Sequence, residues 1–220
     1  MTVKDAVRVA LRAYMGPSAR AAGFKGSAPT WRRINDAGDV ALANVQMSPW
    51  GDRDQTSCYI NLSVAPAPWL EFSSRRRPLP KSLSESYGLY RERLDTRWDI
   101  RSPASAESAV LDMVARLDRD GWPRLNALLN RPTFLSQLRD DGLGEIKQKD
   151  GFEAYFARAE AILLSDAGPS PELDALLERM TADLDPKIRE SWQGAADWIR
   201  ERALSRSEHD EATPAAARHC

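Results

Sequence analysis

The segment 57–64, SCYINLSV, alternates between apolar and polar residues. Because successive side chains of a strand point to opposite faces, this period of two predicts a β-strand with only one face in the core. The core-facing residues are expected to be Cys58, Ile60, Leu62 and Val64, and the opposite row is Ser57, Tyr59, Asn61 and Ser63. A half-covered strand needs hydrogen-bonded neighbours and one covering layer, so it constrains the fold more than any other stretch of the chain.

Neighbouring segments complete the expected sheet. Segment 40–48, VALANVQMS, alternates in the same way, and its even positions end in Gln46 and Ser48. Segment 29–35 precedes it across the turn sequence DAGD, whose residues favour tight turns. Short connections predict antiparallel pairing, and segment 87–100 is a candidate fourth strand.

Helical periodicity brackets this sheet. Apolar residues in 3–22 recur every three to four positions, which predicts an amphipathic helix that breaks or kinks at Gly16-Pro17. Residues 65–86 are rich in Pro, Ser and Arg and are expected to form a loop. From Ser102 onward the apolar stripes have the helical period.

The sequence therefore predicts an α+β fold, in which an N-terminal helix packs on a three- to four-stranded antiparallel sheet and a helical C-terminal half follows. We expect residues 1–140 to form the α+β domain and residues 145–206 to form a helical extension that packs on it. Residues 207–220 lack periodicity and are expected to be a disordered tail.

Composition limits the class of protein. The 220 residues are 42% hydrophobic and 29% charged, which is typical of a globular chain. No apolar run reaches the length of about 20 residues that a membrane helix needs, and charges from Lys4 to Arg12 interrupt what would be the apolar part of a signal peptide. The two cysteines, Cys58 and Cys220, do not suggest a disulfide framework, so we expect a cytoplasmic protein without membrane contact.

The net charge of −1 conceals an asymmetry. Residues 1–101 carry 16 Lys/Arg and 10 Asp/Glu, whereas residues 102–220 carry 15 and 22. The two parts of one fold can complement each other in this way. Alternatively, the basic part attracts an anionic partner.

Several kinds of chemistry lack their residues. Both histidines, His209 and His219, fall in the expected tail, which disfavours histidine-based catalysis and zinc sites. Paired carboxylates in the turns, at Asp36 and Asp39 and at Asp52 and Asp54, have the ligand type for Mg²⁺ or Ca²⁺, but Asp is also common in turns. We expect no catalytic residue, no metal and no cofactor.

The polar row is the main candidate binding surface. Gln46 and Ser48 are expected to lie across from Tyr59 and Asn61, with neighbouring strands about 5 Å apart. Together with Arg33 they would form a patch that binds a partner through hydrogen bonds. The alternative is an ordinary solvated sheet face.

Three further features are candidate contacts. Trp50 follows the second strand and is either a lid on the core or a platform for a ligand. Arg75, Arg76 and Arg77 form a basic run in the expected loop, which suits an acidic partner or phosphates. Trp198 lies off the main apolar stripe of the last helix and is expected to be exposed.

Residues 3–135 resemble a bacterial family known as domain of unknown function 4304. The resemblance is carried by Gly23, Phe24, Gln46, Ser48, Trp50, Asn61 and Leu62. Arg93 and Trp98, and less clearly Trp122, match the later part of the pattern. Ser63 departs from it, since a glycine is usual there, and this departure is expected to alter a bulge or a close contact. The family has no established activity, so the resemblance implies a fold and no function.

We therefore expect a non-catalytic module that binds another protein, with a toxin-neutralising (immunity) role as one form. Its binding residues would be those of the polar patch, Trp50 and the arginine run. The first alternative is a ligand-binding domain or enzyme with a pocket on the sheet face. The second is a nucleic-acid-associated protein that uses the arginine run. Nucleic acid is the less favoured partner because the basic run lacks interleaved aromatic residues.

Overall fold

A computed structural model describes residues 1–50, 53–148, 151–182 and 184–212. Their strands form one antiparallel sheet in the order β1-β2-β3-β4-β5, and β6 pairs with β4 beside β5. The strands are β1 (Lys25–Ser27), β2 (Thr30–Ile34), β3 (Val40–Met47), β4 (Thr56–Ala65), β5 (Tyr90–Arg93) and β6 (Trp98–Ile100). The expected α+β class is confirmed, and segment 87–100 supplies two strands, not one.

Helices account for most of the remaining chain. Before and within the sheet region they are α1 (Val3–Ala10), α2 (Gly16–Ala21) and α3 (Ala67–Ser74). After the sheet they are α4 (Ala106–Arg116), α5 (Trp122–Leu128), α6 (Arg131–Asp140), α7 (Glu153–Leu164), α8 (Pro171–Thr181) and α9 (Pro186–Ala212). Short 3-10 turns lie at Glu85–Tyr87, Pro103–Ser105 and Ser165–Ala167.

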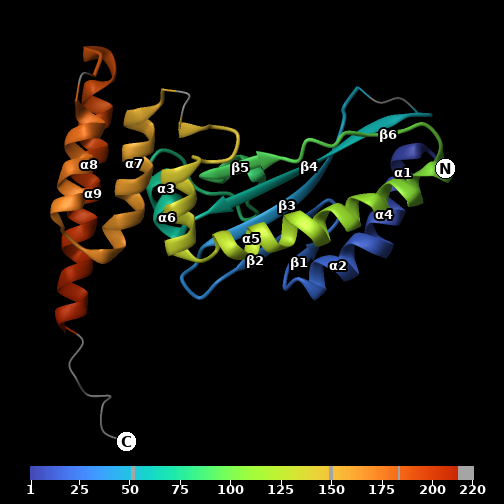
Figure 1. The fold of residues 1–220 in the computed structure, drawn as a ribbon, viewed down its shortest axis with the longest axis horizontal. Helices are drawn as coiled ribbons and strands as arrows, with labels where there is room; N and C mark the ends of the chain where they lie inside the picture. The colour runs from blue at the N-terminus through green and yellow to red at the C-terminus, as the bar shows by residue number, and fades with distance from the viewer. Residues whose placement is uncertain (51–52, 149–150, 183, 213–220) are drawn as a thin grey trace, which may run out of the picture.

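The sheet has one covered face and one partly open face. In Figure 1, α1, α2, α4 and α5 lie along one face, while α3 and α6 to α9 gather at one end of the molecule. The other face is closed only near that end, where the Ser63 hydroxyl donates to the Glu85 carbonyl at 3.0 Å. Toward the β3–β4 hairpin, the side chain of Gln46 on this face is exposed.

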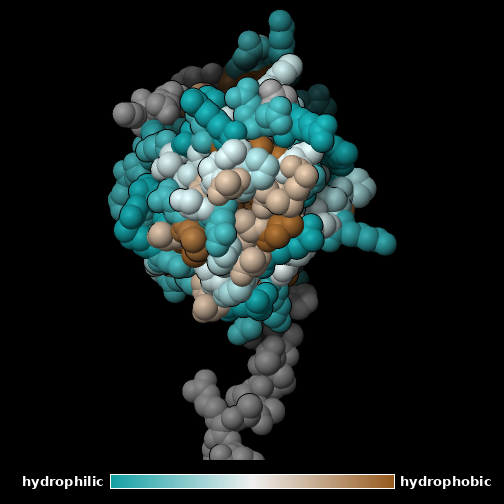
Figure 2. Space-filling view, turned by 90° about the vertical axis from the view of Figure 1, so that its right-hand side faces the viewer, coloured by the Kyte–Doolittle hydropathy of each residue, from teal (hydrophilic) through white to brown (hydrophobic). Residues whose placement is uncertain are grey.

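Viewed from the end that carries the N-terminus and β6, the molecule is mainly hydrophilic (Figure 2). Apolar residues form only small areas near the middle of this end. No helix within the described ranges is both long and apolar enough to cross a membrane.

Two prolines sit inside helical stretches without ending them. At Gly16-Pro17, where a break or kink is expected, a π-helical turn precedes the proline and the helix continues as α2. A proline lacks an amide hydrogen and its ring crowds the carbonyl four residues earlier. Ahead of Pro17 and Pro123 the backbone widens into π-helical turns, Leu11–Met15 and Leu117–Gly121. A π turn relaxes the crowded ladder, so each helix continues past its proline.

The core has two main parts. The first packs the helix-covered face of the sheet against α1, α4, α5, α6 and one side of α7, and includes Phe134, Leu138 and Phe156. The second joins α7, α8 and α9 and also receives Phe72 of α3. α7 contributes to both parts of the core. The division into an α+β domain (1–140) and a helical extension (145–206) stays a prediction.

Three expectations for helical segments need correction. The expected loop 65–86 contains α3, which begins beside Pro68 because a proline is tolerated in the first turn of a helix. Trp198 is not an exposed contact, because its ring packs 5.3 Å from that of Phe72. α9 extends to Ala212, into the predicted tail, and residues 213–220 lie outside the described residues.

The reactivity of the Cys58 thiol can be used to test whether the core-facing side of β4 is buried. Its side chain is fully buried, as expected, and burial raises the pKa of its thiol to about 12. In a Cys220→Ser protein at pH 8, a thiol reagent is therefore expected to modify Cys58 only at the rate of unfolding, since the thiolate is the reactive form. Because the pKa of the unfolded thiol is about 9, this group favours folding below pH 9 and the stability it contributes is lost as pH rises toward 12. Rapid labelling without denaturant would contradict this placement.

Candidate functional site

Four side chains from three strands meet on the open face of the sheet. Arg93 Nε donates to Asn61 Oδ1 at 2.9 Å, and Arg93 Nη2 donates to Gln46 Oε1 at 3.0 Å. Asn61 Nδ2 also donates to Gln46 Oε1 at 3.0 Å. The Arg93 guanidinium lies 4.8 Å from the centre of the Tyr59 ring. We call these residues, Gln46, Tyr59, Asn61 and Arg93, the amide–arginine network.

Strand register explains why they meet. Gln46 pairs with Tyr59 across β3 and β4, and Asn61 pairs with Arg93 across β4 and β5. Paired residues of neighbouring strands place their side chains on the same face. The expected proximity of Gln46, Tyr59 and Asn61 is therefore observed, and Arg93 supplies the guanidinium.

The network retains donors for a ligand. Asn61 is buried, and both ends of its amide are used inside the network. Within the described part of the chain, Gln46 Nε2 and Arg93 Nη1 have no hydrogen-bond acceptor. Asn61 thus fixes the position of Gln46 and Arg93, which present the free donors.

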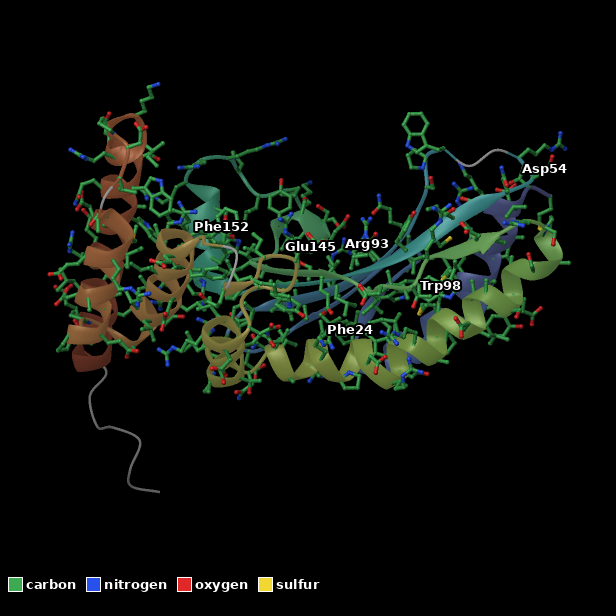
Figure 3. The ribbon with its side chains drawn as sticks, turned by 45° about the horizontal axis from the view of Figure 1, so that its top comes forward. Phe24, Asp54, Arg93, Trp98, Glu145 and Phe152 are labelled. Atoms are coloured by element: carbon green, nitrogen blue, oxygen red, sulfur yellow. The ribbon has the colours of Figure 1, made fainter. Side chains whose placement is uncertain are left out.

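Beside the network is an open pocket of about 190 Å³. Its charged lining consists of Arg91, Arg93, Glu85, Glu92 and Glu145. Figure 3 shows Arg93 and Glu145 close together on this side of the sheet. A pocket lined by both positive and negative side chains is complementary to a partner surface that also carries both positive and negative charges.

A second polar cluster lies toward the hairpin, in a pocket of about 210 Å³. The Ser57 hydroxyl donates to Asp99 Oδ1 at 2.6 Å, and Arg97 Nε donates to the same oxygen at 2.8 Å. These two hydrogen bonds lower the pKa of Asp99, and the bond to Asp99 raises the pKa of Arg97. Asp99 and Arg97 therefore stay charged near pH 7.

Trp50 lines this second pocket with 94% of its surface exposed, so it is not a lid on the core. Ser48 fixes the backbone before it. The Ser48 amide donates to the Ser57 carbonyl at 2.7 Å, and the Ser48 hydroxyl accepts from the Trp50 amide at 3.3 Å. Ser48 thus shapes the end of the strand, while Trp50 is free to contact a partner.

Arg33 does not join the polar patch, which corrects the sequence prediction. It shares the parity of the buried Trp31 on β2, so it points to the helix-covered face. There Arg33 Nη1 donates to Asn126 Oδ1 at 2.8 Å. Arg32 lies on the polar side and donates to the Leu83 carbonyl at 2.6 and 2.9 Å.

The arginine run lies in the turn that directly follows α3. Arg75 caps the C-terminus of α3, and its guanidinium lies 5.5 Å from the centre of the Trp198 ring. Arg76 Nη2 donates to the Ser191 hydroxyl of α9 at 2.9 Å. Both side chains thus contact α9, although all three arginines of the run are exposed.

The turn carboxylates are not grouped as metal ligands. Asp39 is buried and receives hydrogen bonds from Arg131 at 2.5 Å and from the Ala67 amide at 2.8 Å. Asp52 lies outside the described residues. Within the described residues, no cluster of three His, Cys, Asp or Glu side chains could hold a metal ion.

The sequence patterns did not identify Arg93, Arg97 or Asp99 as site residues. Dense charge in segment 87–100 obscured the strand period that would have placed them. For Arg33, the alternation of strand side chains could have given the correct face. Trp31 is the more plausible core residue, and a residue two positions later points to the same face. The same parity assigns Arg32 to the polar side.

The positions that carry the family pattern divide into two groups. Phe24, Trp122 and Trp98 belong to the core, where the Phe24 and Trp122 rings are 4.7 Å apart. Gln46, Asn61 and Arg93 form the network. At Ser63, where the pattern favours glycine, a side chain lies so close to Gly88 that a Cβ on Gly88 would be 1.9 Å from the Ser63 oxygen. The glycine at 88 therefore makes room for the serine at 63.

Comparison with known proteins identifies one family. The model of one family, the domain of unknown function DUF4304, matches residues 15–127. No curated protein and no solved structure matches the chain. The matched residues include the sheet, the amide–arginine network, α2, α4 and nearly all of α5, whereas α1 precedes them. The chain therefore belongs to the DUF4304 family.

Proposed function

We propose that this chain is a non-catalytic module that binds another protein through the open face of its sheet. The observation that carries the proposal is the grouping of Trp50, Tyr59, Arg93 and Arg97 along that face. Trp, Tyr and Arg are the residue types that dominate the binding energy of protein interfaces. Their surroundings are polar and open, which suits the rim of such an interface.

The shape of the surface supports a protein partner over a small ligand. Small molecules favour pockets of about 300–1,000 Å³ that enclose most of the ligand. The three pockets that contain network or hairpin residues have volumes of about 190, 210 and 360 Å³, and all three are open hollows that would not enclose a ligand. Because Gln46 and Arg93 are held by Asn61, they would lose little side-chain freedom on binding.

The partner and setting are part of the same proposal. A toxin-neutralising role is one form of it, since inhibition by surface contact requires no active site. We further propose a bacterial cytoplasmic protein, from the family resemblance and the sparse, buried cysteine. Nucleic acid is disfavoured because the arginine run lacks the interleaved aromatic residues on which bases stack.

Substitution of Trp50 tests this function. We expect Trp50→Ala to weaken partner binding by about 10- to 100-fold, because truncating a central aromatic residue typically removes about 1.4–2.8 kcal/mol of binding energy. Partners are captured from nuclease-treated lysate of the native host with the full chain, and the dissociation constant of a purified partner is then measured by calorimetry.

Leu111→Ala is the matched control. Leu111 is a large apolar residue of α4 that is 46% exposed, and α4 lies on the helix-covered side of the sheet. It should leave binding unchanged, whereas Arg93→Gln should weaken it. A partner bound equally well by the wild type, Trp50→Ala and Arg93→Gln proteins would refute the proposed face.

A further inference from the structure

A pocket of about 200 Å³ lies between α3 and α9, away from the open sheet face. It is lined by Phe72, Arg75, Arg76, Ser191, Gly194 and Ala195. None of these residues belongs to the amide–arginine network or to the pocket beside Trp50. A water molecule in the liquid occupies about 30 Å³, so this volume has room for a small polyatomic anion.

The charges around this pocket are positive. Arg75 and Arg76 line it, and Arg158 of α7 lies behind Phe72, 5.9 Å from the centre of that ring. Burial lowers the pKa of Arg158; Tyr155 opposes this effect, and the nearby positive charge of Arg76 adds to it. Arg158 is also 4.2 Å from the centre of the Trp192 ring, and its buried Nε has no hydrogen-bond partner in the described structure.

Carboxylates do not neutralise these arginines. Among the described residues, Arg75, Arg76 and Arg158 form no ion pair, whereas Arg131, Arg139 and Arg202 each pair with two carboxylates. The C-terminal half is rich in Asp and Glu. Three neighbouring arginines without an acidic partner in such surroundings therefore favour an anionic ligand.

Gly194 opens the floor of the pocket. Ser191, Gly194, Ala195 and Trp198 follow one another at helical spacing, so they share one face of α9. A Cβ atom on Gly194 would meet nothing within 4 Å, which shows that the space above it is empty of protein. A glycine inside a helix is unfavourable relative to alanine, so an open space above it suggests a packing or binding role.

We propose that the groove formed by Arg75, Arg76, Ser191 and Gly194 binds an oxyanion of the phosphate class, and that Arg158 adds positive charge from behind. Arg76 already donates to the Ser191 hydroxyl, so the two groups are positioned to donate jointly to one anion. Arg75 is placed on the other side by its contact with Trp198. The side chains required for binding are thus held in place before the ligand arrives.

Isothermal titration calorimetry with inorganic pyrophosphate, at constant ionic strength, tests this site in the full chain. Direct heat is measured because phosphate salts also stabilise proteins without binding. We expect saturable binding by the wild type and a dissociation constant at least about tenfold higher for Arg76→Gln, which loses a charged donor. Gly194→Glu places a carboxylate between the arginines and should abolish binding while the protein stays folded by circular dichroism.

Arg200→Gln is the matched control, because it removes the same charge from an exposed position of α9 that pairs with Asp197. It should bind pyrophosphate as the wild type does. A parallel assay with vesicles of phosphatidylglycerol, and of phosphatidylcholine as the neutral reference, distinguishes a lipid headgroup from a soluble phosphate compound. Absence of binding in both assays, or equal binding by the wild type and Gly194→Glu, would overturn the proposal. Neither result bears on the open sheet face.

Discussion

Arg202→Ala is expected to lower the free energy of unfolding by about 3 kcal/mol, because it removes the charged centre of a buried network. The Arg202 side chain is only 4% exposed. It contacts Glu71 of α3 at 2.9 Å, Asp166 at 2.8 Å and the Ser165 hydroxyl at 3.0 Å. Removal of the arginine leaves Ser165 without its donor and takes away the positive charge that Asp166 shares.

The expected value lies at the lower end for a buried ion pair, for a structural reason. Glu71 and Asp166 are 51% and 38% exposed, so water partly replaces the lost guanidinium. Asp166 also keeps its contact with Arg131 at 3.0 Å. Urea unfolding, followed by tryptophan fluorescence and by circular dichroism, measures the change.

Arg206→Ala is the control for this substitution. Arg206 also approaches Asp166, but at 3.7 Å and with 52% of its side chain exposed. Exposed pairs of this kind contribute less than about 1 kcal/mol. Equal effects of Arg202→Ala and Arg206→Ala would show that burial of Arg202 does not stabilise the junction of α3 and α9.

Gly144→Ala is expected to lower the free energy of unfolding by about 2–4 kcal/mol. Gly144 has φ +83°, a conformation that disfavours alanine by about 1–2 kcal/mol, and an added Cβ would lie 2.1 Å from the Arg91 carbonyl oxygen. The neighbouring backbone would have to shift. Two hydrogen bonds are then weakened, from the Arg91 amide to Leu143 O and from the Glu145 amide to Arg91 O. Each contributes about 0.5–1.5 kcal/mol.

Gly38→Ala separates the two effects. Gly38 has a similar φ of +80°, but an added Cβ would meet only Ala67 Cβ at an ordinary distance of 3.5 Å. We expect a loss of about 1–2 kcal/mol there, from the backbone conformation alone. Amide hydrogen exchange should show faster exchange of the Arg91 and Glu145 amides only in Gly144→Ala. Unchanged exchange at these amides would contradict the predicted displacement.

Strand periodicity predicted the central sheet well, because one face of β3 and β4 is buried and the period of two is therefore strongly expressed. Cys58 and Ile60 are fully buried, as their parity requires. The same pattern placed Gln46 and Asn61 on the opposite face, where they share a hydrogen bond. Burial of one face thus made the other face predictable as well.

Arg93 and α3 were not predictable from local pattern, for different physical reasons. β5 is short and charged because one of its faces meets solvent and ion pairs, so its period carries no hydrophobic signal. α3 is short and is stabilised by contacts with distant residues, such as Arg202 to Glu71. Helices of this length depend on tertiary packing more than on their own propensity.

The first part of the core extends beyond residue 127, where the match to the family ends. The family pattern ends at that residue, yet Phe134, Leu138 and Phe156, which pack into the same core, lie beyond it. A fragment that stopped at residue 127 would leave the apolar surface beneath these side chains open to water. We therefore expect that residues 15–127 alone do not fold stably. We also expect relatives that share only this pattern to cover the same end of the sheet with segments of their own, and the family to diverge in sequence there.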